Sequence, residues 1–312
     1  MKMERRPAID GKIAIVTGAS SGIGESVARE FAQAGALTVL AARRAERLER
    51  LASEIHKMGG TALPVQTDLT DVSQIANLVQ TTLYTFGRID ILANIAGWGL
   101  YDWFEELSLG ELRRHYDVNV IGMAELTRHV IPTMKAQRSG YILNMSSYTS
   151  RISVPPLTVY ASTKYAIEGL TDGLRRELRP WGITVIRIHP SSVSGTEFNQ
   201  RVVRPGVIHY KSLPIGRVSR ERLARKIVEL VERPRRALFY SRIYEVPVLL
   251  NKLFPEIIDW VSKNWVRGKR NKELPPPAEV APVQYARSFS LWPLLGGFLA
   301  IGLIARLWQK KL

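Results

Sequence analysis

The chain has 312 residues, more than the roughly 250 that one α/β domain uses, so its length predicts one large domain with an extension. Hydrophobic residues make up 46% and charged residues 23%, which excludes disordered and collagen-like chains, and the absence of cysteine excludes disulfide scaffolds, thiolate zinc sites and cysteine nucleophiles. The net charge of +16 favours an anionic partner: nucleic acid, anionic lipid or an anionic small molecule.

Short apolar runs rich in Val, Ile and Leu alternate with helical patterns along the first two thirds of the chain. Strands are predicted at residues 13–17, 37–42, 61–66, 89–94, 141–146 and 183–189, with helices at 21–34, 44–58, 72–86, 109–137 and 159–180. Strands that lack polar alternation and are separated by helices indicate a parallel sheet covered on both faces. The sequence therefore predicts an α/β fold over residues 1–240: a doubly wound parallel sheet in three layers.

A different pattern follows the predicted sheet. Residues 241–273 form a basic amphipathic segment in which apolar side chains recur at spacings of three and four, and Pro255 interrupts the helical pattern. Residues 274–288 are rich in proline and predict a stiff linker. Residues 289–308 carry one charge, Arg306, and predict a helix that spans a membrane or lies at its interface. A buried helix, or one that packs on a partner subunit, is the alternative.

The positive charge is concentrated before this apolar tail. Residues 1–200 carry 22 basic and 20 acidic side chains, whereas residues 201–272 carry 18 basic and 6 acidic ones. Basic residues beside an apolar segment favour an anionic membrane surface as partner, with a solvated helix face as the alternative. Nucleic acid is not expected, because the chain contains no recognised nucleic-acid-binding module.

A glycine-rich turn, TGASSGIG at residues 17–24, joins the first predicted strand to the first helix. Glycines let the backbone approach a pyrophosphate closely, and the helix N-terminus adds N–H groups and the positive end of its dipole. The position of the turn between strand and helix therefore predicts a phosphate site rather than a purely structural turn.

The end of the second strand favours NADP(H) over NAD(H). Folds that prefer NAD usually place a carboxylate there to bind the ribose hydroxyls, whereas an arginine accommodates a 2′-phosphate. This chain has Arg43 and Arg44 at that point, with Ser20 and Ser21 as supporting donors. The alternative is that the two arginines begin a solvated helix face.

Tyr160 and Lys164 are four residues apart in a predicted helix, so they lie on one face of it. A lysine beside a tyrosine favours the phenolate, and we expect Lys164 to lower the pKa of Tyr160 from its usual value of about 10. The phenol would then exchange a proton nearer neutral pH.

Several motifs together resemble the classical short-chain dehydrogenases/reductases. They are the TGASSGIG turn, Asp68 after the third strand, NIAG at residues 94–97, Asn119 within a helix, Ser147 thirteen residues before Tyr160, and the pentad YASTK at residues 160–164. Their order and spacing match that family over about residues 9–240. The resemblance implies a Rossmann-type fold and an enzyme that interconverts a carbonyl and an alcohol, with a bound nicotinamide cofactor carrying the hydride.

The resemblance also implies roles for particular residues. Tyr160 would exchange the proton, Lys164 would hold the nicotinamide ribose, and Asn119 would support Lys164 through a water. Ser147 would bind the substrate oxygen, with Ser146 as the alternative. The implied cofactor contacts are Gly18, Ser20, Gly22, Ile23 and Gly24 at the pyrophosphate, Asp68 and Leu69 at the adenine, and Asn94 and Gly97 at the neighbouring ribose, in addition to Ser21, Arg43 and Arg44.

One segment departs from the family pattern. Residues 190–196 have a serine where the family commonly has the glycine of a Pro-Gly pair, and Thr196 is displaced by one residue. Val193 is expected to contact the nicotinamide carboxamide through its backbone, whereas the role of Thr196 stays open. Residues 194–216, rich in Gly, Pro and aliphatic residues, are predicted to form a lid.

An aromatic cluster follows the NIAG motif. It would lie near the carboxyl end of the fourth strand, where open α/β sheets bind ligands, and it predicts an apolar substrate cleft lined by Trp98, Tyr101, Trp103 and Phe104. A packed loop or an oligomer contact is the alternative. Combined with the apolar tail, the cluster favours a lipophilic carbonyl or alcohol as substrate.

Two other functions stay open from the sequence: a non-catalytic NADP(H)-sensing scaffold, and an epimerase or dehydratase on the same fold. No metal site is expected, because the five histidines are scattered without ligand spacing. The family resemblance suggests a homodimer or homotetramer. Because NADPH is an intracellular cofactor, the catalytic domain is expected on the cytosolic side of a membrane.

Overall fold

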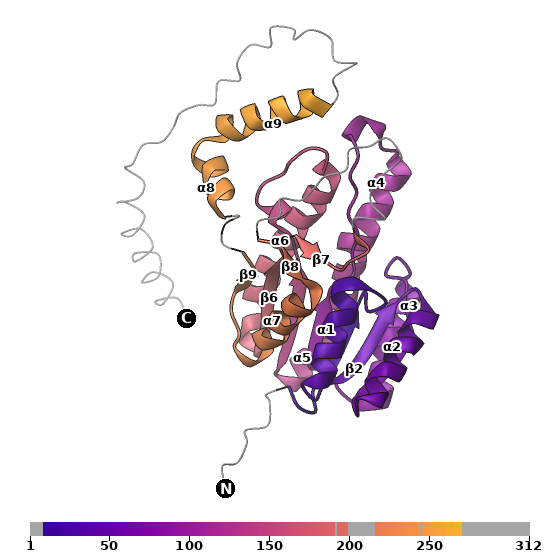
Figure 1. The fold of residues 1–312 in the computed structure, drawn as a ribbon. Helices are drawn as coiled ribbons and strands as arrows, with labels where there is room; N and C mark the ends of the chain where they lie inside the picture. Colours follow the sequence, from indigo (N-terminus) through magenta and orange to yellow (C-terminus); the bar gives the residue numbers. More distant parts are fainter. Residues whose placement is uncertain (1–8, 191, 199–215, 242, 244, 270–312) are drawn as a thin grey trace, which may run out of the picture. The chain divides into compact units, whose positions relative to one another are not determined.

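Parallel strands form the centre of the fold (Figure 1). The computed structural model describes residues 9–190, 192–198, 216–241, 243 and 245–269, and the elements named below belong to these ranges. The strands of the main sheet are, in spatial order, β3 (Thr61–Gln66), β2 (Leu37–Ala42), β1 (Ile13–Thr17), β4 (Ile91–Asn94), β5 (Gly140–Met145), β6 (Ile183–His189) and β9 (Ala237–Phe239). All neighbouring pairs are parallel. The predicted doubly wound sheet is confirmed.

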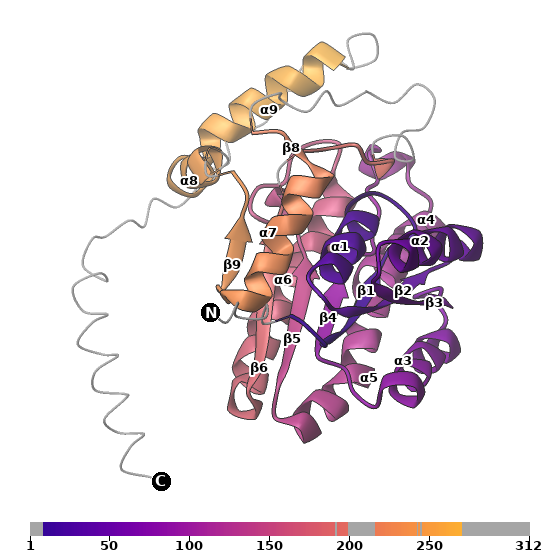
Figure 2. The same cartoon turned by 60° about the horizontal axis from the view of Figure 1, so that its bottom comes forward.

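Helices cover both faces of this sheet (Figure 2). One hydrophobic cluster contains residues of α1 (Gly22–Gln33), α2 (Ala45–Lys57) and α7 (Arg220–Glu232), and the other contains residues of α3 (Val72–Phe86), α5 (Gly122–Gln137) and the end of α6 (Thr158–Leu178). Neighbouring residues of a strand point to opposite faces, so Val16 of β1 lies in the first cluster and Ile15 in the second. The three predicted layers follow from this alternation.

The helix predicted over residues 109–137 is divided in the structure. Residues Leu109–Tyr116 form α4, Asp117–Ile121 form a π-helical turn, and α5 begins at Gly122. A Cβ at Gly122 would lie 2.2 Å from the carbonyl oxygen of Leu69, so the start of α5 presses against the loop after β3. Hydrophobic periodicity predicts a helix here but not this turn, whose position depends on the contact with that distant loop.

Two further helices follow β9: α8 (Glu245–Leu253) and α9 (Pro255–Lys269). Pro255 begins α9, which suits a residue that lacks a backbone N–H and has a fixed φ. Many of the large apolar side chains on these helices, and that of Phe254 between them, are exposed: Val246, Leu249, Leu253, Phe254, Ile257, Trp260 and Val261. No helix within the described ranges is both long and apolar enough to cross a membrane. The predicted linker (274–288), the predicted apolar helix (289–308) and residues 199–215 of the predicted lid lie outside those ranges.

Candidate active site

A cavity of about 910 Å³ opens at the carboxyl ends of the strands. Strand order reverses between β1 and β4, and the cavity is lined by the segments that follow these two strands together with those after β2, β3, β5 and β6. Crevices at such a reversal are where open α/β sheets bind their ligands. The fold therefore brings segments that are distant in sequence to one site.

The glycine-rich turn forms one wall of this cavity. Gly18 and Gly22 have φ angles of 70° and 62°, which favour glycine. A Cβ at Gly24 would lie 2.3 Å from the Gly18 carbonyl oxygen, so only glycine lets α1 begin this close to β1. The predicted cofactor residues found in the wall of the cavity are Gly18, Ser20, Ser21, Gly22, Ile23, Gly24, Arg43, Arg44, Asp68, Leu69, Gly97 and Val193. The residues present fit a dinucleotide.

The side chain of Asn94, predicted to contact a ribose, does not line the cavity. Its side chain is buried, and Nδ2 donates to the side-chain oxygens of Asn144 (2.9 Å) and Thr127 (3.0 Å) rather than lining the cavity. Asn94 ends β4, where its side chain meets a neighbouring strand and α5. Its position in the NIAG motif therefore reflects a structural hydrogen-bond network that links β4, β5 and α5.

The two arginines at the end of β2 have different surroundings. Arg44 donates from Nη2 to Ser21 Oγ (2.7 Å) and Ser20 Oγ (2.9 Å). The Arg43 guanidinium is more than half exposed and lies 4.0 Å from Asp68. Arg44 is therefore the arginine that the structure joins to the glycine-rich turn, and Ser20 and Ser21 are its partners.

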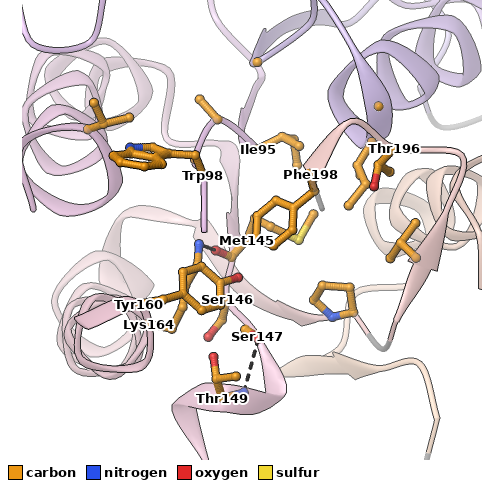
Figure 3. Close-up of a pocket in the computed structure, with 18 of the residues that line it drawn as sticks. Ile95, Trp98, Met145, Ser146, Ser147, Thr149, Tyr160, Lys164, Thr196 and Phe198 are labelled. Atoms are coloured by element: carbon orange, nitrogen blue, oxygen red, sulfur yellow. Dashed lines mark hydrogen bonds between the residues drawn. The ribbon is translucent and has the colours of Figure 1, made fainter. Parts of the chain in front are cut away.

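Tyr160 and Ser147 meet inside the cavity. Both line it, and the Ser147 hydroxyl is close enough to the phenol to lower its pKa. Ser147 Oγ also accepts from the backbone N–H of Thr149 at 3.1 Å, which fixes its rotamer. Ser146, the alternative, lies next to it, but its hydroxyl donates to Ser150 Oγ at 3.1 Å. Of the two serines, Ser147 is the one that affects the phenol, and Figure 3 shows its hydrogen bond with Thr149.

Lys164 lies one helical turn beyond Tyr160 on α6. Its Nζ is 5.6 Å from the centre of the Tyr160 ring and donates to the Met145 carbonyl oxygen at 3.0 Å. Burial lowers the pKa of Lys164 to about 8, and the negative charge of Glu168 partly opposes this effect. At neutral pH most of the protein therefore carries a protonated Lys164 in this cavity.

The expected lowering of the Tyr160 pKa is wrong for this structure. Burial of the phenol raises its pKa above the usual value, and the nearby Ser147 hydroxyl offsets only part of that effect. Removing water from a phenolate is unfavourable, and Lys164, which is held by Met145, does not compensate. Tyr160 is therefore protonated at neutral pH, the form that donates a proton.

Asn119 lies behind the cavity wall, on the π-helical turn. Its Oδ1 accepts from the backbone N–H of Trp98 (3.1 Å), and its Nδ2 donates to the carbonyl oxygen of the same residue (2.9 Å). A Cβ at Gly97 would lie 3.2 Å from Asn119 Oδ1 and 3.6 Å from Lys164 Nζ. Asn119 and Lys164 therefore both lie close to Gly97, and Asn119 holds the segment after β4 through Trp98.

A histidine that the sequence did not single out completes this group. His115 is fully buried, its Nε2 lies 3.2 Å from Asn119 Nδ2, and its ring meets Trp98 edge to face at 4.7 Å. Burial, with a smaller contribution from the Lys164 charge, lowers the His115 pKa to about 4. His115 is therefore neutral at physiological pH and orients the Asn119 amide. Its spacing of four residues before Asn119 was the available sequence signal.

The predicted substrate cleft is only partly confirmed. Trp98 and Tyr101 line the cavity, whereas Trp103 and Phe104 are not among its lining residues, and Phe104 is 58% exposed. The chain turns into a short 3₁₀ helix at Phe104, which directs that segment away from the site. The sequence missed other apolar lining residues: Ile152, Val154, Leu157, Phe198, Pro247, Ile258 and Val261.

Phe198 and Thr196 come from the segment after β7 (Val193–Ser194), the beginning of the predicted lid. The Phe198 ring lies 5.7 Å from the Tyr160 ring, next to which it appears in Figure 3. Thr196 lines the cavity close to the glycine-rich turn, since a Cβ at Gly22 would lie 3.5 Å from the Thr196 side chain. This segment therefore spans the cavity from the phosphate side to Tyr160.

Comparison with known proteins agrees with this geometry. Residues 12–205 match the short chain dehydrogenase family. An uncharacterized oxidoreductase of Staphylococcus saprophyticus is 33% identical over 201 residues, which are 64% of this chain and 75% of that protein.

Two solved structures are similar to this chain. One is a metagenomic short-chain oxidoreductase in complex with NADP, with 28% identity, a TM-score of 0.63 and coverage of 72% of this chain and 92% of that one. The other is 3-ketoacyl-(acyl-carrier-protein) reductase from Brucella melitensis complexed with NADH, with 32% identity, a TM-score of 0.66 and coverage of 74% and 96%. The glycine-rich turn, the serine–tyrosine–lysine cluster and these matches lead to one conclusion: the chain belongs to the short-chain dehydrogenase family of oxidoreductases.

Proposed function

We propose that this protein interconverts a carbonyl and an alcohol with NADP(H), and that Tyr160 exchanges the proton. The observation that carries the proposal is the meeting of Tyr160, Ser147 and Lys164 in the same cavity as the glycine-rich turn. A non-catalytic scaffold has no need of a buried phenol and ammonium at that place. The NADP complex of a structurally similar oxidoreductase supports the choice of cofactor class.

The preference for NADP(H) rests on residues of this chain, because one solved relative binds NADP and the other NADH. The end of β2 has no carboxylate for the ribose hydroxyls, and Arg44 is held beside the turn by Ser20 and Ser21. An arginine there accommodates a 2′-phosphate. Arg43, also in the cavity wall, adds positive charge at the same place.

Each residue of the site has its own role in the proposed reaction. The bound cofactor supplies or accepts the hydride. In carbonyl reduction Tyr160, protonated at neutral pH, donates its proton to the substrate oxygen, and Ser147 donates a hydrogen bond to that same oxygen. Lys164 places a positive charge near the phenolate that is left, and Asn119 holds the backbone beside Lys164. In alcohol oxidation the proton moves in the opposite direction.

The substrate is proposed to be lipophilic. Apolar side chains on the described loops and on α8 and α9 line the cavity that contains Tyr160, among them Trp98, Leu157, Phe198 and Ile258. Such a lining favours an apolar chain or ring next to the reacting carbonyl. The name of the Brucella relative, which is a 3-ketoacyl reductase, describes an oxo group on an acyl chain.

A panel of carbonyl compounds tests the proposed substrate class. NADPH consumption is expected with long-chain and polycyclic ketones or aldehydes. With short polar carbonyl compounds it should be at least about tenfold slower, since each buried methylene of the substrate contributes roughly 0.8 kcal/mol. The measurement is kcat/KM from NADPH absorbance for each compound. Turnover of the short polar compounds alone would overturn the lipophilic assignment, and product formation without net NADPH consumption would favour an epimerase or dehydratase.

We also propose that α8 and α9 contact an anionic membrane surface, with the catalytic residues on its cytosolic side. These helices expose Leu249, Leu253, Ile257 and Trp260 and carry four basic and three acidic residues themselves, while most of the positive excess of residues 201–272 lies just before them in the chain. Apolar side chains combined with basic ones are typical of helices at membrane interfaces. Residues 289–308 would add a second attachment through their apolar sequence.

Vesicle flotation tests the membrane contact. The full chain is expected to float more completely with vesicles that contain phosphatidylglycerol than with phosphatidylcholine alone, and added salt should reduce the difference, because each basic residue near an anionic surface contributes about 1 kcal/mol. Trp260→Asp should weaken flotation several-fold. Tyr84→Asp, at a residue of α3 that is 95% exposed, is the matched control. Equal flotation of the Trp260 variant and the unaltered chain would exclude α9 from the contact.

A further inference from the structure

An acidic residue lies in the cluster that the sequence assigned to the cofactor phosphate. Glu197 Oε1 is 2.6 Å from Arg47 Nη1, and Oε2 is 3.2 Å from Arg44 Nη1. Glu197 follows β7 in the first described part of the predicted lid, whereas both arginines belong to the segment where α2 begins. These residues are about 150 positions apart in the chain, and neither Arg47 nor Glu197 was predicted to have a role.

The backbone on either side of the lid holds Glu197 in this place. Strand β7 pairs with β8 (Val218–Ser219), with Val193 opposite Val218 and Ser194 opposite Ser219. Thr196, the neighbour of Glu197, lies near the glycine-rich turn, since a Cβ at Gly22 would be 3.5 Å from its side chain. Two independent contacts, the short strand pair and the threonine, therefore place the carboxylate over the arginines.

The residues around the Glu197 carboxylate form an anion site. Arg44 and Arg47 supply two guanidinium groups, and Ser20 and Ser21 accept hydrogen bonds from Arg44. A hydroxyl that accepts from a guanidinium still has its own O–H to donate. The site therefore offers more donors than one carboxylate uses, and a phosphate, with more oxygens and about −1.5 to −2 charge, matches them better.

We propose that Glu197 occupies the position of the cofactor's 2′-phosphate and is displaced when NADP(H) binds. The inference rests on the proposed function, since it takes the arginine cluster as the 2′-phosphate site. Glu197 then competes with the phosphate and reduces the affinity for NADP(H). It has no such effect on NAD(H), which has no 2′-phosphate to compete for the arginines.

Displacement of Glu197 has a consequence at the catalytic tyrosine. The next residue, Phe198, lies beside the Tyr160 ring and against Gly99, where a Cβ would be only 2.5 Å from the Phe198 ring. Because Glu197 and Phe198 are adjacent in the chain, release of the carboxylate from Arg44 and Arg47 removes one of the contacts that position Phe198. Binding of the 2′-phosphate is thereby coupled to the apolar cover over Tyr160.

Calorimetric titration of the full chain with adenosine 2′,5′-bisphosphate and with 5′-AMP tests the competition. Glu197→Gln is expected to tighten binding of the bisphosphate about three- to tenfold, the range for loss of a partly exposed ion-pair network, and to change AMP binding less than twofold. Glu197→Asp keeps the charge but is one methylene shorter, so it should bridge the two arginines less well and tighten bisphosphate binding to an intermediate degree. Glu229→Gln, which removes an equal charge from an exposed pair with Lys226 on α7, is the matched control and should change neither affinity.

The outcomes separate the possible failures. Unchanged or weaker bisphosphate binding in Glu197→Gln would overturn the competition. An Asp variant identical to the unaltered chain, combined with a tighter Gln variant, would show a general effect of charge and would overturn the specific position of the carboxylate on the arginines. If the unaltered chain bound the bisphosphate no better than AMP, the proposed NADP(H) preference itself would fail, and the competition with it.

Discussion

Replacement of Tyr160 by Phe is expected to lower kcat about 10² to 10⁴-fold, the usual contribution of a positioned proton donor, while the Kd for NADPH changes less than about twofold. Phe keeps the aromatic ring in its buried site but removes the O–H that the substrate oxygen needs. Ser147 stays held by the Thr149 N–H. It cannot replace the phenol as proton donor, since an aliphatic hydroxyl has no ring over which to delocalise the negative charge left on its oxygen. The measurements are steady-state NADPH oxidation and fluorescence titration of NADPH.

Tyr165→Phe is the matched control for this experiment. Tyr165 lies on the same helix, five residues further along, and is 46% exposed. Its variant is expected to keep full turnover. If Tyr160→Phe retained turnover close to that of the unaltered chain, Tyr160 would not be the proton donor, and if both variants lost NADPH binding, damage to α6 would explain the result.

The kcat/KM for NADPH in carbonyl reduction is expected to fall as the pH rises through about 8. Lys164 has a pKa of about 8, so it is charged below that pH and neutral above it. A neutral amine no longer stabilises the phenolate that Tyr160 becomes after proton donation, and kcat/KM should drop about tenfold per pH unit above the pKa. Lys164→Met is expected to be at least about 10²-fold slower at pH 7. Its kcat/KM should also lose the fall above pH 8, which is the alkaline limb of the pH profile.

Glu168→Gln provides a second measurement of the same group. The negative charge of Glu168 raises the pKa of Lys164, so its removal should shift the alkaline limb to lower pH. Glu168 also pairs with Arg187 at 2.7 Å, so a thermal unfolding curve must accompany the variant to show that it is folded. A limb that stayed at the same pH in a folded Glu168→Gln variant would mean that a group other than Lys164 titrates.

Local sequence patterns predicted the sheet closely, because the strands of a parallel sheet covered on both faces are continuous apolar runs. Strands β1, β2, β3 and β6 have the predicted bounds. The π-helical turn between α4 and α5 was not predicted, since it follows from the contact of Gly122 with the loop after β3. Short-range periodicity contains no information about such a contact.

In the site, too, local features were predicted from the sequence and features that depend on distant contacts were not. The glycine-rich turn and the Tyr160–Lys164 pair were predictable, because each depends on spacing within a few residues. The motif around Asn94 does not show which way its side chain points, and only the structure shows that a hydrogen bond to Asn144 directs it into the sheet. Trp103 and Phe104 were misassigned to the cavity because aromatic residues in a loop do not show where the loop turns.

The sequence by itself determined the α/β class, the family and the side chains available for catalysis, because these depend on short local motifs and on their order along the chain. Only the tertiary structure decided the electrostatics of the site. Burial raises the pKa of Tyr160 and lowers that of Lys164, and Glu197 reaches Arg44 and Arg47 from about 150 residues away. Desolvation and ion pairing depend on which distant segments meet, and no motif within a single segment specifies that meeting.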